Sequence, residues 1–63
     1  MILKTIVERL VENDVYIYIK NISKEFAGKI LSINEDNIVT LEDKNNNLIH
    51  IPLSEITIIT ERR

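Results

Sequence analysis

Residues 26–43, FAGKILSINEDNIVTLED, decide the fold that the sequence predicts. The polar run at residues 34–37 separates two apolar segments, as is typical of a turn between two strands. The second segment, residues 38–41, is rich in β-branched side chains, which suit a pleated sheet. Gly28, the only glycine in the chain, marks a bulge, a bend or the close approach of another backbone. We therefore expect a strongly bent hairpin that lets a short sheet curl into a small barrel.

An amphipathic helix is expected before this hairpin, over residues 2–12. Its apolar side chains recur at helical spacing and form one stripe, and Asn13-Asp14 should end it because Asn tolerates the left-handed conformation. The stripe is expected to cover one open end of the barrel, and a partner or membrane surface is the alternative. Its members are Leu3, Ile6, Val7, Leu10 and Val11.

Period-two alternation predicts a half-buried strand over residues 15–20, with Tyr16 and Tyr18 together on one face. These tyrosines either stack nucleic-acid bases or cover the outer layer of the barrel or a subunit contact. Pro52 should end a later strand or lie on a sheet edge, because it has no N–H to donate. The segment 61–63 should be a frayed end. The other expected strands cover residues 25–33, 38–43, 48–51 and 56–60.

The composition narrows the possible classes of protein. The 63 residues suffice for one domain, residues 1–63, whose core is small and marginal alone. With no cysteine and one histidine, neither a disulfide nor a multi-histidine metal site is possible, so oligomerisation is the remaining source of stability unless the core alone suffices. The net charge of −2 gives no global attraction to nucleic acid but leaves room for a local basic patch. Neither a spanning segment nor a signal peptide is evident, so we expect a cytoplasmic protein.

Catalysis is not expected. A nucleophilic triad needs a histidine with an orienting carboxylate, and His50 with Ser54 is the only conceivable pair. No glycine-rich phosphate loop exists, so no cofactor is expected. Four carboxylates could gather around a divalent cation if a ring brought copies together, but solvated turn charge explains them better. These are Glu35, Asp36, Glu42 and Asp43.

Several segments resemble the Sm-like family, which includes the LSm and Hfq proteins. Residues 15–21, VYIYIKN, look like its first strand, and residues 26–34, FAGKILSIN, look like its glycine-containing second strand. The spacing through residues 35–43 to a leucine, here Leu41, is similar to that of its third strand. Residues 48–59 resemble the last two strands of Hfq-type members, so the resemblance covers nearly the whole chain.

The resemblance implies a mainly β fold: an N-terminal α-helix followed by a strongly bent five-stranded antiparallel SH3-like barrel. Family members form rings, here of about five to seven subunits, by pairing the fourth strand of one subunit with the fifth of the next. They bind single-stranded, often uridine-rich, RNA through the loops after the second and fourth strands. No membrane or small-molecule substrate is implied. The expected subunit-interface residues are Ile49, Ile51, Ile56 and Ile58; the expected RNA-binding residues are Asn34, Asn37, His50, Lys29, Tyr16 and Tyr18.

The chain departs from the family pattern at the expected RNA site. Asn34 stands where the family has an aspartate, Asn37-Ile38 replaces a methionine–asparagine pair, and the arginine–glycine element is absent. The lysine–histidine pair of Hfq aligns with His50-Ile51, and Glu35 and Asp36 would repel phosphate. Two alternatives therefore stay open: an assembly barrel that has lost the RNA site, and a monomeric SH3-like or PRC-like interaction module.

Overall fold

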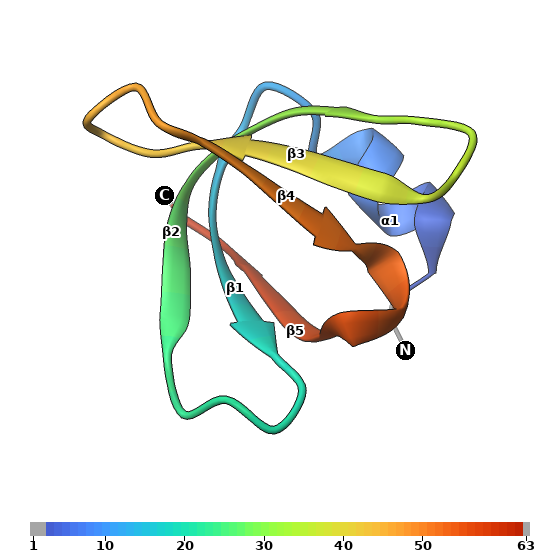
Figure 1. The fold of residues 1–63 in the computed structure, drawn as a ribbon. Coiled ribbons are helices and arrows are strands. Elements are labelled where there is room, and N and C mark those ends of the chain that lie inside the picture. The colour runs from blue at the N-terminus through green and yellow to red at the C-terminus, as the bar shows by residue number, and fades with distance from the viewer. Residues whose placement is uncertain (1–2, 63) are drawn as a thin grey trace.

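The computed structural model describes residues 3–62. It contains a short helix and five antiparallel strands in one curved sheet with the order β4-β3-β2-β1-β5 (Figure 1). The expected mainly β fold with an N-terminal helix is therefore confirmed. The sheet is not closed, because β4 and β5 are its two edges and are not paired with each other. The elements are α1 (Lys4–Arg9), β1 (Asp14–Ile19), β2 (Glu25–Ile33), β3 (Ile38–Glu42), β4 (Leu48–Pro52), the 3-10 helix η1 (Leu53–Glu55) and β5 (Ile56–Glu61).

Helix α1 is shorter than the apolar stripe predicted. Val7 and Leu10 pack into the core as expected, whereas Leu3 is 65% exposed and Ile6 is 40% exposed. The predicted terminator was wrong, because Glu12 and not Asn13 adopts the left-handed conformation, with φ at 73°. The N–H of Glu12 then donates to the Ile30 carbonyl at 2.6 Å. Ile2, in the predicted helix, and Arg63, in the predicted frayed end, lie outside the described residues. Within the described part of the chain, no helix is long and apolar enough to cross a lipid bilayer.

The core lies between the inner face of the curved sheet and α1. Alternation on β1 is as predicted, since Val15 and Ile17 are fully buried while Tyr16 and Tyr18 lie on the outer face. Burial of these apolar side chains is the main stabilising contribution available to so small a domain. Among residues 3–62, the buried apolar residues are Val7, Leu10, Val15, Ile17, Ile30, Val39, Leu41, Ile51, Leu53 and Ile56.

Strand β2 bends so that its first half pairs with β1 and its second half with β3 (Figure 1). The register of β2 against β3 shifts between Ile30 and Ser32, which places a bulge there rather than at Gly28. Gly28 is required for a different reason. A Cβ atom at Gly28 would overlap the carbonyl oxygen of Glu42 and lie 3.2 Å from Cγ of Leu41. Of the three expected reasons for this glycine, the close approach of another backbone is the one observed.

The hydrogen bonds that flank β4 determine which of its backbone groups face the free edge. The N–H of Asp43 donates to the carbonyl of Asn47, and the N–H of Leu53 donates to the carbonyl of Asn37. Because ladder bonds in an antiparallel pair alternate, Ile49 and Ile51 direct their backbone groups to β3. The free edge of β4 therefore presents the N–H and carbonyl groups of Leu48 and His50 and the carbonyl of Pro52. An N–H at position 52 would point to this free edge and could not bond to β3. Proline at this position therefore removes no hydrogen bond between β3 and β4, as expected for an edge proline.

Candidate nucleic-acid interface

The expected RNA-binding residues lie on separate surfaces of the protein. Tyr16 and Lys29 line one hollow, Asn37 lines a second and His50 lines a third. The six residues therefore do not form a single site. The first hollow combines an aromatic ring with cationic side chains, which is the composition expected where single-stranded nucleic acid binds.

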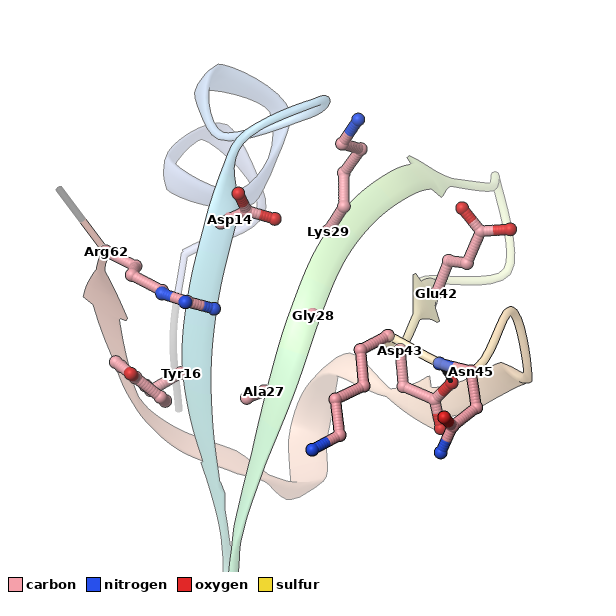
Figure 2. A pocket seen from close by; sticks show the side chains of 10 residues that line it. Asp14, Tyr16, Ala27, Gly28, Lys29, Glu42, Asp43, Asn45 and Arg62 are labelled. Atoms are coloured by element: carbon pink, nitrogen blue, oxygen red, sulfur yellow. Dashed lines mark hydrogen bonds between the residues drawn. The ribbon is translucent and has the colours of Figure 1, made fainter.

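This first hollow, called the outer hollow below, has a volume of about 470 Å³ (Figure 2). Its floor is low because Ala27 and Gly28 present almost no side chain. Tyr16 and Arg62 stand on one side of the floor, and the turn after β3 stands on the other (Figure 2). The lining residues are Asp14, Tyr16, Ala27, Gly28, Lys29, Glu42, Asp43, Lys44, Asn45 and Arg62.

Tyr16 and Arg62 form a cation–π pair along one wall of the outer hollow. The guanidinium carbon lies 5.9 Å from the centroid of the tyrosine ring. Arg62 is fixed at its backbone, because its N–H donates to the Asp14 carbonyl at 2.9 Å. A planar guanidinium beside an aromatic face offers both stacking and phosphate-binding groups at one place.

The charges around the outer hollow balance. Three cationic side chains (Lys29, Lys44 and Arg62) face three carboxylates from the same lining. In the strand register, Lys29 on β2 lies opposite Asp14 on β1 and opposite Glu42 on β3. The hollow therefore has no net charge, and any phosphate affinity must come from cations placed locally.

Asp43 organises the turn that carries Lys44 and Asn45. Its Oδ1 accepts hydrogen bonds from the N–H groups of Asn45 at 2.8 Å and Asn47 at 2.9 Å. Asn46 completes the turn with φ at 63°. The backbone hydrogen bond from Asn47 is the main reason that the pKa of Asp43 is lowered. The ionised carboxylate of Asp43 therefore holds this wall of the hollow in place.

Acid should weaken this turn. Because the pKa of Asp43 is lowered in the folded state, its contribution to stability is present above the ordinary aspartate pKa of about 3.9. The contribution is lost as the pH falls through the folded-state value. We expect Asp43→Ala to melt below the wild type at pH 7, and the gap to close on acidification in thermal scans. Asp43→Asn is the control, because its amide keeps an acceptor without the charge. A gap that stays constant to pH 2 would refute this role.

Tyr18 is occupied elsewhere on the outer face. Its hydroxyl donates to Oε2 of Glu25 at 2.6 Å, and this hydrogen bond is the main reason that the pKa of Tyr18 is raised. Lys24 is likewise engaged, with its ammonium nitrogen 5.3 Å from the centroid of the Phe26 ring. Tyr18 is also absent from the lining of the outer hollow, so of the two tyrosines only Tyr16 remains a candidate base platform there.

Asn34 and Asn37 hold the turn between β2 and β3. Oδ1 of Asn34 accepts from the N–H groups of Asp36 at 2.9 Å and Ile38 at 3.0 Å. Asn37 adopts φ of 61°, a conformation that Asn tolerates better than most residues. Both asparagines are therefore explained by the turn itself.

The turns after β2 and after β4 lie against each other, with the N–H of Leu53 donating to the carbonyl of Asn37. They form the turn hollow, of about 390 Å³. Besides Lys4, this hollow contains a carboxylate and mostly apolar or neutral groups, so its attraction to phosphate is weak. Its lining residues are Leu3, Lys4, Asp36, Asn37, Pro52, Leu53 and Ser54.

His50 and the expected interface residues lie on or near the free edges. Nδ1 of His50 is 3.1 Å from Oγ1 of Thr40 on the neighbouring strand. Ile58 is 54% exposed and Ile49 is half-buried. Ile51 and Ile56, however, are 6% and 0% exposed. Both side chains pack in the core of the subunit, and Ile51 also lines the third hollow.

Lys44 and Arg62 also line the outer hollow, although no local sequence pattern singles them out. One lies in a polar turn and the other near the chain end, and both positions usually carry solvated charge. The pairing of β1 with both β2 and β5 brings Arg62 beside Tyr16, a contact that no local pattern indicates. Among residues 3–62, no group of three or more histidine, cysteine, aspartate or glutamate side chains is placed to hold a metal ion.

Comparisons with protein-family models, with curated proteins and with solved structures gave no match to this chain.

Proposed function

We propose that this protein binds single-stranded RNA at the outer hollow, as a homo-oligomer built from Sm-like subunits. The observation that carries the proposal is the wall formed by Tyr16 and Arg62, 5.9 Å apart, beside Lys29 and Lys44. A base stacks on the tyrosine ring, and the three cations contact the flanking phosphates. A single strand is the preferred form because its bases are free to stack.

Assembly supplies what one copy lacks. One subunit offers three cations against three carboxylates in its outer hollow, so its affinity for phosphate is low. A ring repeats the Tyr16 platform around its circumference, and a strand that contacts several copies gains from effective concentration. The open sheet supports this assembly, because its two edges, β4 and β5, are the strands that the family resemblance pairs between subunits. We expect about five to seven subunits in a closed ring.

Fluorescence anisotropy with labelled oligo-uridine and oligo-adenine tests the RNA proposal. Tyr16→Ala should weaken binding roughly 5- to 150-fold, which corresponds to about 1–3 kcal/mol for a stacked base. Tyr16→Phe keeps the ring and should bind close to the wild type. Raising the salt from about 50 to 200 mM should weaken binding roughly 20-fold for every three phosphates contacted.

Charge reversal locates the site. Lys44→Glu removes a cation from the outer hollow, and Lys4→Glu makes the same change in the turn hollow. We expect Lys44→Glu to weaken RNA binding and Lys4→Glu to leave it nearly unchanged. The opposite result would move the site to the turn hollow. Absence of any RNA affinity at low salt would end the RNA proposal.

A second candidate function is assembly without RNA. The carboxylates favour it, because Asp14, Glu42 and Asp43 line the outer hollow and the exposed Glu35 and Asp36 lie in the turn after β2. A ring would repeat these charges in every subunit and repel phosphate. An oligomer with no RNA affinity at low salt is the result that would select this candidate.

A further inference from the structure

An apolar hollow of about 230 Å³ lies beside the free edge strand β4. This edge hollow is lined by Ile19, Phe26 and Ile49, which pack half-buried against the core. Ile22 at its rim is 51% exposed. Because the hollow adjoins a strand whose outer side pairs with nothing in the sheet, it is open to a further strand.

The other free edge carries an exposed apolar side chain. Ile58 on β5 is 54% exposed and lies opposite Tyr18 on the outer face. Arg62 N–H donates to the Asp14 carbonyl at the end of this pair, so alternation directs the backbone groups of Thr60 and Ile58 toward β1. The backbone of Ile59 consequently faces the free edge, while its side chain packs against the core.

The two free edges therefore differ in a way that fixes how they can join. Along a strand, side-chain direction and backbone hydrogen-bonding direction alternate together. On β4, the residues that face the free edge, Leu48 and His50, have side chains on the outer face. On β5, the residue that faces the free edge, Ile59, has its side chain on the core face.

An antiparallel joint between these edges turns one sheet over relative to the other. Residues directly opposite each other across a ladder have their side chains on the same side. The side chain of Ile59 faces the core in its own copy, and that of His50 or Leu48 faces outward in the next copy. Across the joint, these side chains then lie on the same face of the joined sheet. Ile58, an outer residue in its own copy, is carried to the core side of the neighbour's β4.

We infer that Ile58 of a second copy fills the edge hollow of the first, opposite Ile49 or Ile51 according to the register. The inference rests on the proposed assembly and adds to it the side-chain contact that joins the copies. A parallel joint would instead leave Ile58 on the outer face beside Leu48, still in water. The antiparallel joint removes an exposed isoleucine and an open apolar hollow together, and its ladder bonds are better aligned. Each copy supplies one Ile58 and one hollow, so the contact is heterologous and propagates around a ring.

Disulfide trapping tests the contact, since the chain contains no cysteine of its own. Ile58→Cys protein is mixed with a larger, tagged Ile49→Cys or Ile51→Cys protein and oxidised. Residues 49 and 51 occupy non-hydrogen-bonded positions in the joint, where the Cα atoms come close enough for a disulfide. We expect a cross-linked heterodimer with one of these two partners and none with tagged Leu48→Cys. Cross-linking to Leu48→Cys, or to neither Ile49→Cys nor Ile51→Cys in oligomeric protein, would overturn the inference.

Analytical ultracentrifugation separates this inference from the assembly on which it rests. A wild-type protein that stays monomeric at high concentration removes the assembly and the contact together. An oligomer that cross-links through Leu48→Cys keeps the assembly and removes only the contact. Ile58→Asp should shift the protein to monomer while its circular dichroism stays native, whereas Ser32→Asp, the same charge on an exposed position of β2, should leave the oligomer intact. An Ile58→Asp protein that assembles like the wild type also contradicts the contact.

Discussion

Gly28→Val should unfold much of the protein population at physiological temperature. The first atom of any side chain at Gly28 would overlap the carbonyl oxygen of Glu42, which belongs to the backbone and cannot rotate away. Overpacking of a core costs about 1–3 kcal/mol, and occasionally more. Here the obstacle is a paired strand, so we expect a cost of about 3 kcal/mol or more. A domain of this size has roughly 3–9 kcal/mol in total, and the melting temperature should fall by about 12–24 °C.

Ala27→Val is the matched control for Gly28→Val. Ala27 is the preceding residue of the same strand, and its side chain is exposed on the outer face. Valine favours strands, so this variant should melt within a few degrees of the wild type. Equal melting temperatures for wild type and Gly28→Val, measured by circular dichroism, would show that β2 and β3 do not approach each other as described.

Ile30→Ala should be the most damaging truncation in the sheet. Its side chain is fully buried, and its backbone bonds to Glu12 and Asn13, which join α1 to β1. Truncation of a buried isoleucine costs about 2–5 kcal/mol, because both the transfer energy and a cavity are involved. The alanine also leaves a void at the position where β2 passes from β1 to β3, next to the bulge.

Chemical denaturation measures the cost of Ile30→Ala. Ile22→Ala removes the same atoms from a side chain that is 51% exposed, and it should cost no more than about 0.5 kcal/mol. The midpoint should shift for Ile30→Ala without a change in the slope of the unfolding transition. Equal costs for the two variants would mean that Ile30 is not a core residue.

Local patterns were sufficient to predict the elements. The alternation at residues 15–20, the polar runs between strands and the position of Pro52 each depend on a few neighbouring residues. The predicted strand end at Asp43 was one residue too long, because this side chain accepts hydrogen bonds from the turn instead of extending the ladder. Helix α1 was also predicted too long, since Val11 and Glu12 are needed to turn the chain toward β1.

Non-local geometry limited the prediction of the site. Asn34 and Asn37, predicted to contact RNA, are also the residues that hold the turn between β2 and β3, a role that depends on the folded turn. Apolar residues on edge strands have the same pattern whether they face a core or a partner, and the predicted interface residues Ile51 and Ile56 pack in the core of the single subunit. The contact of Arg62 with Tyr16 depends on the pairing of the first strand with the last, which a linear pattern does not contain.

The position of Pro52 has a consequence for misfolding. A strand from an unrelated chain that docks on β4 finds outward N–H donors only at Leu48 and His50, because the next outward position is proline. Amyloid growth needs a long uninterrupted row of such donors. The proline therefore shortens the template that β4 offers for fibril growth, while its carbonyl remains available to a neighbouring strand.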